Sequence, residues 1–169
     1  MVPPVRVLGI DTSLRSSGLG VVDAAGSALR LVHQQTVATP ARQPLSACLR
    51  RLDEALGALL AEYRPEVAAI EGIFFCKNVK TAVILGEARG VVIARCAAAG
   101  VPVYEYPPRR VKQALVGHGD ADKEQVGRMV MRLLNLQDLP QEDAGDALAI
   151  AICHLHTRTS IAALQAKPL

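Results

Sequence analysis

Apolar residues in this chain form short uninterrupted runs near the N-terminus and recur at helical spacing further on. The run at 5–11 ends in a carboxylate and predicts a buried strand. Residues 18–23 and 28–36 carry the next two runs, and the segment 24–27 between them, which contains Gly26, predicts a turn. Three strands joined in this way form an antiparallel meander.

The next segment has the periodicity of an amphipathic helix. Between 44 and 63, leucines recur at intervals of three and four residues, and charged residues fall on the opposite face. Arg64-Pro65 ends this helix, and the apolar run 66–71 returns to strand. Strand, helix and strand in this order are typical of a crossover connection, so 66–71 is expected to lie parallel to 5–11.

The second half of the chain predicts four helices and one further strand. Pro102 places that strand near an edge of the sheet, because proline cannot donate a hydrogen bond to a neighbouring strand. The first helix carries Gly86, Gly90 and Ala94 at intervals of four, a spacing that lets another helix approach closely. The elements are a helix at 79–99, a strand at 101–106, a basic helix from Pro107-Pro108, a helix at 122–134 and a helix at about 142–156.

These elements predict an α/β fold with a five-stranded mixed sheet, in which the antiparallel meander is followed by parallel strands and helices flank the sheet. We expect residues 1–157 to form a single domain. Residues 158–169 have no periodic core face, so we expect a flexible C-terminal tail there. A chain of 169 residues that is 50% hydrophobic can bury a full core without disulfides or a structural metal.

Charge and cysteine content narrow the class of protein. The net charge is +3, which is mild support for a polyanionic partner. The N-terminus lacks a basic region followed by a long apolar run, and no apolar stretch has the length of a membrane span, so we expect neither secretion nor membrane insertion. Widely spaced cysteines favour buried thiols in a reducing cytoplasm over a zinc site or a disulfide framework. They are Cys48, Cys76, Cys96 and Cys153.

Four acidic residues stand where a nucleic-acid hydrolase needs them. Asp11 and Glu71 each close a predicted buried strand, and carboxylates placed there lie at the edge of the sheet where reactive groups collect. Asp143 and Asp146 are three residues apart on one face of the last helix. Converging carboxylates repel one another unless a cation lies among them, and oxygen ligands select Mg²⁺ or Mn²⁺. The pattern predicts phosphodiester hydrolysis with two divalent ions about 4 Å apart.

Simpler interpretations exist for single acids. Asp143 and the neighbouring Glu142 are also suited to stabilise the N-terminus of a helix. Asp146 is harder to explain in this way, because an unpaired charge beside the apolar run 147–152 is costly. The segment around Asp11 also resembles the first phosphate hairpin of actin-like and sugar-kinase ATPases, but this chain has no room for their second domain.

Candidate substrate contacts follow Glu71 and recur in the second half of the chain. Phe74 and Phe75 are adjacent in an irregular loop, and we favour Phe74 for stacking on an unpaired base. Most basic residues of a protein face water, but those near the acids are candidates for phosphate contacts. Lys112 and Lys123, on either side of the loop 117–119, are the first choices. The full set of basic candidates is Lys77, Lys80, Arg89, Arg109, Arg110, Lys112, Lys123 and Arg128.

Several short segments across about residues 5–156 occur in one characteristic order and spacing. They are 8–11 with Gly18 and Gly20, 69–71 leading into Phe74, Lys77-Asn78, 86–90, 111–113 and 143–151. In this order they resemble the RuvC-type Holliday junction resolvases, which belong to the RNase H-like superfamily of nucleases. Any one segment alone is a weak match, but the set is specific.

The resemblance implies an RNase H-like fold and a Mg²⁺-dependent endodeoxyribonuclease. Such an enzyme resolves Holliday junctions by paired symmetric nicks in recombination and DNA repair, and it leaves 5′-phosphate ends. Phe74 matches the aromatic residue that stacks at the opened junction, and Lys112 and Lys123 match basic residues near the scissile strand. The positions that match the family's catalytic and metal-binding acids are Asp11, Glu71, Asp143 and Asp146.

The resemblance also implies an assembly. The expected protein is a cytoplasmic homodimer, and the helix with Gly86 and Gly90 matches the segment at the dimer interface. Its expected partners are four-way junction DNA, a junction-binding tetramer and a hexameric branch-migration motor, the last two of the RuvA and RuvB type.

Two positions depart from the family pattern. Thr12-Ser13 stand where family members typically carry Pro-Gly, which leaves the hairpin after Asp11 less constrained. Gly145 lies where Ala is more usual, and a glycine inside a helix costs roughly 1 kcal/mol relative to Ala. Neither change removes a ligand, so we expect activity to survive.

Two other functions are compatible with these residues. One is an RNase H-like nuclease that acts on RNA or an RNA–DNA hybrid, and the other is a catalytically silent junction-binding protein. Retention of all four acids speaks against the silent protein, because a pure binder gains nothing from negative charge that faces phosphate.

Overall fold

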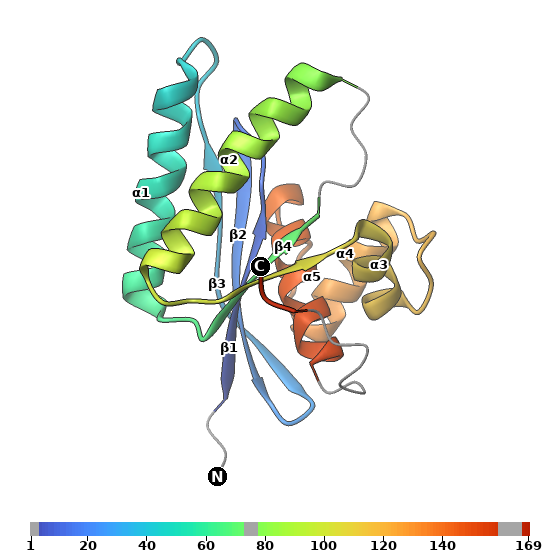
Figure 1. The fold of residues 1–169 in the computed structure, drawn as a ribbon. Helices are drawn as coiled ribbons and strands as arrows, with labels where there is room; N and C mark the ends of the chain where they lie inside the picture. Colours follow the sequence, from blue (N-terminus) through green and yellow to red (C-terminus); the bar gives the residue numbers. More distant parts are fainter. Residues whose placement is uncertain (1–3, 73–77, 159–166) are drawn as a thin grey trace.

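A mixed sheet of five strands with helices on both faces makes up the described part of the chain (Figure 1). The structure is a computed structural model and describes residues 4–72, 78–158 and 167–169. Its strands are β1 (Val5–Asp11), β2 (Ser16–Ala25), β3 (Ala28–Ala38), β4 (Val67–Glu71) and β5 (Val103–Tyr106). Its helices are α1 (Leu45–Tyr63), α2 (Val79–Ala98), α3 (Pro108–Val116), α4 (Lys123–Leu133) and α5 (Glu142–Thr157).

The strand order is β3-β2-β1-β4-β5, and it confirms the predicted topology. β1, β2 and β3 pair antiparallel, whereas β4 pairs parallel with both β1 and β5. The meander strands are longer than predicted, because the pairing of β2 with β3 runs from Ser16 opposite Ala38 to Ala25 opposite Ala28, where a turn at Gly26 with φ of +61° closes it. β5 is an edge strand, as Pro102 indicated.

Alternation along β1 assigns its side chains to two separate cores. Val7 belongs to the core that α3, α4 and α5 cover, whereas Leu8 and Ile10 belong to the core beneath α1 and α2. Because successive side chains of a strand point to opposite faces, Gly9 and Asp11 share the face of Val7. Asp11 therefore ends β1 on the side of the sheet that α5 covers.

Glycines let α5 rest directly on β1 and β2. A Cβ atom at Gly9 would lie 1.9 Å from the carbonyl oxygen of Ala147, and one at Gly18 would lie 1.8 Å from that of Asp143. Gly9 pairs with Gly20 across the two strands, so three glycines form one smooth strip under the helix. Such distances leave no room for any side chain, and this contact fixes how closely the start of α5 approaches the sheet.

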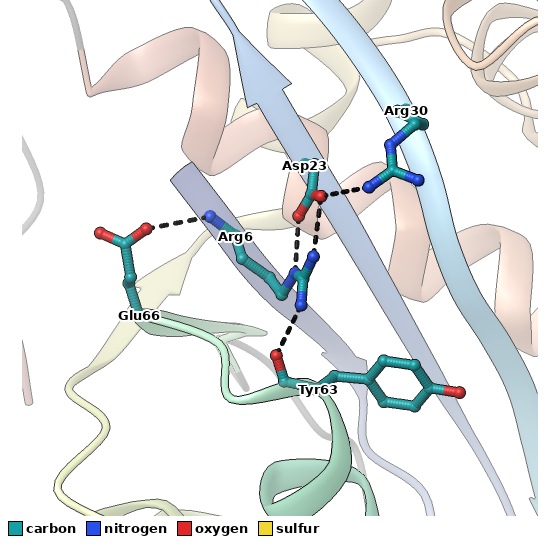
Figure 2. Close-up of polar contacts among 5 residues, drawn as sticks. All are labelled: Arg6, Asp23, Arg30, Tyr63 and Glu66. Atoms are coloured by element: carbon teal, nitrogen blue, oxygen red, sulfur yellow. Dashed lines mark hydrogen bonds and ion pairs between the residues drawn. The ribbon is translucent and has the colours of Figure 1, made fainter. Parts of the chain in front are cut away.

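At the opposite end of β1, ion pairs surround a buried carboxylate (Figure 2). Asp23 on β2 is only 3% exposed and binds the guanidinium groups of Arg6, at 2.7 and 2.9 Å, and Arg30, at 2.7 Å. The hydrogen bond from Arg6 is the main reason why the pKa of Asp23 is lowered. Arg6 also donates to the carbonyl of Tyr63, and its backbone N–H donates to Glu66. The cluster ties the end of α1 and the approach to β4 to the meander.

Three of the four cysteines, Cys48, Cys96 and Cys153, are buried free thiols, as expected. Cys76 lies outside the described residues. Among the described helices, none has the length and apolar character that a membrane crossing needs.

The predicted flexible tail at 158–169 lies largely outside the described residues, so it stays a prediction. At its described end, the backbone N–H of Leu169 donates to the carbonyl of Val103 at 2.9 Å, and Pro168 forms an isolated bridge with Tyr104. These contacts place residues 168 and 169 beside the edge strand β5.

Gly18→Ala tests the contact between α5 and β2. We expect it to lower the free energy of unfolding by about 2–3 kcal/mol, because the new methyl group forces the helix off the strand. Gly57→Ala in α1 is the control, since a Cβ there meets its nearest neighbour, the guanidinium of Arg95, only at 3.6 Å. The control is expected to be neutral or to stabilise by up to about 1 kcal/mol. Urea denaturation measures both, and equal midpoints for Gly18→Ala and the unmutated protein would contradict the contact.

Candidate active site

Three of the four predicted acids line one cavity of about 330 Å³. Asp11 and Glu71 come from the ends of β1 and β4, and Asp146 comes from the second turn of α5. Lys112 on α3 and Lys123 on α4 line the same cavity. The structure thus brings residues from five separate elements to the end of the sheet where β1 and β4 finish.

Local geometry explains why Asp11 and Glu71 are neighbours. β1 and β4 are parallel, and Ile10 pairs with Ile70 immediately before the two acids. Corresponding residues of adjacent parallel strands point to the same face, so both carboxylates face α5. The apolar wall of the cavity consists of Pro108, Val111, Val126, Ala149 and Ile150.

Asp143 lies beside this cavity but does not line it. Its backbone carbonyl rests on Gly18, which is the pairing partner of Asp11 across β1 and β2. Its carboxylate oxygen Oδ2 accepts a short hydrogen bond from the hydroxyl of Ser16, the first residue of β2. The fourth acid is therefore close to Asp11 but is held from the β2 side.

The acids disturb one another electrostatically. Burial, followed by the negative charges of Asp146, Glu71 and Asp143 in that order, raises the pKa of Asp11 to about 7, against the opposing charge of Lys123. The pKa values of Glu71 and Asp146 are also raised, in both cases mainly by burial. Carboxylates with raised pKa values in a cleft mark a candidate functional site, because the fold holds together charges that would separate in solution.

Lys123 is the cation nearest to Asp146 in the described structure. Its ammonium group forms a short ion pair with Glu142 and a longer one, at 3.6 Å, with Asp146. These contacts raise the pKa of Lys123, and the largest cause is the hydrogen bond that its ammonium group donates to Glu142. Both Lys123 and Glu142 are about 70% exposed, so this pairing is weak and can be exchanged for other partners.

The donor chemistry of the site fits a hard divalent cation. All four candidate ligands are carboxylates, and a dication among them would relieve the repulsion that, after burial, contributes to the raised pKa values of Asp11, Glu71 and Asp146. Among the described residues, however, no three side chains of His, Cys, Asp or Glu yet converge closely enough to enclose an ion. The acids are gathered, and Lys123 still occupies one side of Asp146.

The other predicted contact residues are placed differently. Arg89 lies on the α2 side of the sheet, where it pairs with Glu105 and donates to the backbone carbonyl of Glu71 at 3.2 Å. It supports the strand end that carries Glu71, and its contact with DNA stays a prediction. Lys80 is exposed in the first turn of α2. Phe74 and Lys77 lie outside the described residues.

Sequence reasoning missed two residues of this site. Glu142 was considered only for the N-terminus of the helix, although its pairing with Lys123 follows from the packing of α4 beside α5. Ser16 was not considered at all. The only hint in the sequence was the missing Pro-Gly turn, which leaves Ser13 in the hairpin and Ser16 and Ser17 at the start of β2.

Comparison with known proteins decides between the possible hydrolase families. Residues 7–154 match the family model described as crossover junction endodeoxyribonuclease RuvC. The chain belongs to the RuvC family. It is 53% identical over 151 residues to the crossover junction endodeoxyribonuclease RuvC of Alkalilimnicola ehrlichii, with 89% of this chain and 91% of that protein covered. It is 48% identical to the protein of the same name from Halorhodospira halophila, with 92% of each chain covered.

Solved structures agree with the family assignment. RuvC of Thermus thermophilus in complex with a Holliday junction substrate superimposes with a TM-score of 0.90 at 39% identity, over 98% of this chain and 99% of that chain. The yeast mitochondrial Holliday junction resolvase Ydc2 superimposes with a TM-score of 0.66 at 13% identity, over 92% of this chain and 80% of that chain, and this likeness concerns the fold alone. The predicted RNase H-like fold is confirmed.

The raised pKa of Asp11 gives a pH prediction for the metal-free protein. Because folding raises this pKa from 3.8 to about 7, the free energy of unfolding that Asp11 contributes falls as the pH rises through this interval. NMR of the labelled carboxyl carbon should show Asp11 titrating near 7. Asp146→Asn should lower that value by removing a negative charge, whereas Asp120→Asn, at an exposed site, should leave it unchanged. Titration of Asp11 near 4 would contradict this picture.

Proposed function

We propose that this protein resolves Holliday junctions by divalent-metal-dependent hydrolysis of DNA phosphodiester bonds, in recombination and DNA repair. The observation that carries the proposal is the cavity where Asp11, Glu71 and Asp146 meet Lys112 and Lys123 in a member of the RuvC family. Negative ligands and positive side chains in one cavity suit a metal ion and a phosphate at the same time. The junction bound by the Thermus thermophilus relative supports DNA as the substrate.

Each group in the site has a distinct proposed role. Asp11, Glu71, Asp143 and Asp146 would hold Mg²⁺, with Mn²⁺ as a substitute. Two ions held by these residues would supply an activated water and would stabilise charge on the phosphate and the leaving oxygen. Lys112 and Lys123 neutralise the phosphates next to the scissile bond. The products are a 5′-phosphate and a 3′-hydroxyl, which ligase can join.

Further residues are proposed to contact the DNA, and the cysteines suggest the cell compartment. Phe74 would stack on a base at the opened junction, and Lys77, Lys80 and Arg89 would contact the DNA backbone. Buried free thiols support a reducing cytoplasm. The RuvA-type tetramer and RuvB-type motor are proposed partners through family membership alone.

We also propose that α2 forms a homodimer interface. Val79 and Val83 on α2 are 78% and 54% exposed, which is unusual for apolar side chains of this size. Gly86 and Gly90 follow on the same helix, and a Cβ at either position would meet no atom within 4 Å. A helix with an open apolar face and small residues suits a second copy of itself, and a two-fold dimer supplies two active sites for two strands.

Val83→Asp tests this interface, because a charge at its centre opposes burial. We expect the variant to sediment as a monomer at concentrations where the unmutated protein is a dimer. Leu139→Asp is the matched control, since Leu139 has the same 54% exposure but lies outside α2. A dimeric Val83→Asp variant, or a monomeric control, would contradict the proposal.

Asp11→Asn and Asp146→Asn test the metal ligands. Each replaces a charged donor by a neutral side chain of the same shape, so we expect cleavage to fall by at least about 1000-fold, as loss of several kcal/mol of transition-state stabilisation predicts. Binding of the junction should persist, because the lysines remain. Nicking of an end-labelled four-way junction measures the rate, with Asp120→Asn as the control. A ligand variant that nicks at the rate of the unmutated protein would refute the assignment.

The same assay separates the alternative functions. Paired, ligatable nicks that appear with Mg²⁺ and disappear with a chelator support the resolvase. Preferential cleavage of an RNA–DNA hybrid in competition with the junction supports a nuclease for RNA. Binding without cleavage at any metal concentration supports a silent junction-binding protein.

Lys112→Ala tests the phosphate contact. It should reduce the slope of log affinity against log salt concentration by about one unit, because one phosphate contact is lost. Arg50→Ala is the control, since Arg50 is 73% exposed on α1, beneath the other face of the sheet. Fluorescence anisotropy with a labelled junction provides both slopes, and an unchanged slope for Lys112→Ala would remove it from the interface.

A further inference from the structure

The hairpin between β1 and β2 is closed by serines instead of a Pro-Gly turn. The backbone N–H of Ser13 donates to the hydroxyl of Ser17 at 3.0 Å, and that hydroxyl donates to the carbonyl of Ser13 at 2.6 Å. The hydroxyl of Ser13 donates to the carbonyl of Ser16 at 2.8 Å and accepts the N–H of Ser16 at 3.1 Å. Four hydrogen bonds thus close the hairpin, and two of them hold the backbone N–H and carbonyl of Ser16, although the sequence lacks a rigid turn.

Ser16 connects this hairpin to the active site. Its hydroxyl group is the donor to Oδ2 of Asp143, a residue 127 positions further along the chain. The backbone of Asp143 is also fixed by β2, because its carbonyl lies against Gly18. Both the main chain and the side chain of this acid are therefore positioned by one strand.

A role of Asp143 in helix capping alone does not explain this contact. The N-cap residue of α5 is Gln141, and no side-chain hydrogen bond caps it within the described chain. The carboxylate of Asp143 is in the first turn, but its hydrogen-bond donor comes from β2. Hydrogen bonds to a carboxylate that leave one oxygen available are typical of groups that orient metal ligands.

We propose that Ser16 is a positioning residue for metal binding, which holds Oδ2 of Asp143 and leaves Oδ1 for the divalent cation shared with Asp11. The proposal rests on the proposed function of Asp143 as a ligand. A charge-assisted hydrogen bond favours one rotamer of the carboxylate, so the entropy of ordering it is lost before the ion binds. Partners of this kind typically contribute 10-fold to 100-fold to metal affinity or activity.

Ser16→Val and Ser16→Thr form the decisive pair. Both side chains are β-branched and suit a strand, but only threonine keeps the hydroxyl group. We expect Ser16→Val to weaken Mn²⁺ binding by about tenfold in calorimetric titration of the full chain, and Ser16→Thr to restore it. Ser46→Ala, at an exposed serine of α1, is the control and should bind Mn²⁺ as the unmutated protein does.

Two further readouts separate positioning from a general structural effect. In the metal-free protein, NMR couplings of the Asp143 side chain should indicate one χ1 rotamer, and Ser16→Val should show averaging over several. In the cleavage assay, Ser16→Val should lower kcat while the affinity for the junction stays constant. Equal Mn²⁺ affinity and equal couplings in Ser16→Val and Ser16→Thr would overturn the proposal.

Asp143→Asn distinguishes failure of this inference from failure of the proposed function. If Asp143→Asn cleaves junctions at the rate of the unmutated protein, Asp143 is not a metal ligand. The proposed role of Asp143 and the proposed role of Ser16 are then both wrong. If Asp143→Asn is inactive but Ser16→Val behaves like Ser16→Thr, the nuclease assignment stands and the role of Ser16 alone is wrong.

Discussion

The close approach of α5 to β1 and β2 is the constraint on which the site depends. Gly9 and Gly18 let backbone atoms of α5 lie directly on the strands, and Gly20 makes room for the side chain of Leu148. Because Gly18 pairs with Asp11, this contact brings the first turn of α5 to the end of β1. Any larger residue in the strip would push Asp143 and Asp146 away from the acids of the sheet.

The same packing brings several negative charges close together, and the positive charges nearby compensate them only in part. Asp11, Glu71 and Asp146 are gathered in a partly buried cavity, where burial and mutual repulsion favour protonation. Lys123 offsets some of the charge, but it is an exposed side chain shared with Glu142. In the proposed function, a divalent cation would offset far more of this charge and would release the exposed ammonium group of Lys123 for phosphate.

The sequence predicts the elements and the acids that form this site better than it predicts the contacts that hold individual side chains in place. Alternating and helical patterns locate the elements, and a carboxylate directly after a buried strand identifies Asp11 and Glu71. The contact of Ser16 with Asp143 spans 127 residues and has no local pattern, so only the packing of α5 on β2 reveals it. Likewise, the ion pair of Arg89 with Glu105 has no local pattern, because Glu105 lies on a strand that only the pairing of β4 with β5 places nearby. The contact of Arg89 with DNA stays a prediction.

The central claim is that four carboxylates from three parts of the fold share divalent ions. Diffraction from crystals grown with Mn²⁺, measured at the manganese absorption edge, tests it most directly. The account predicts anomalous density between the carboxylates of Asp11 and Asp146, within coordination distance of both, with the ammonium of Lys123 displaced from Asp146. Saturating Mn²⁺ that leaves this cavity without anomalous density, and the ion pair of Lys123 with Asp146 intact, would contradict it.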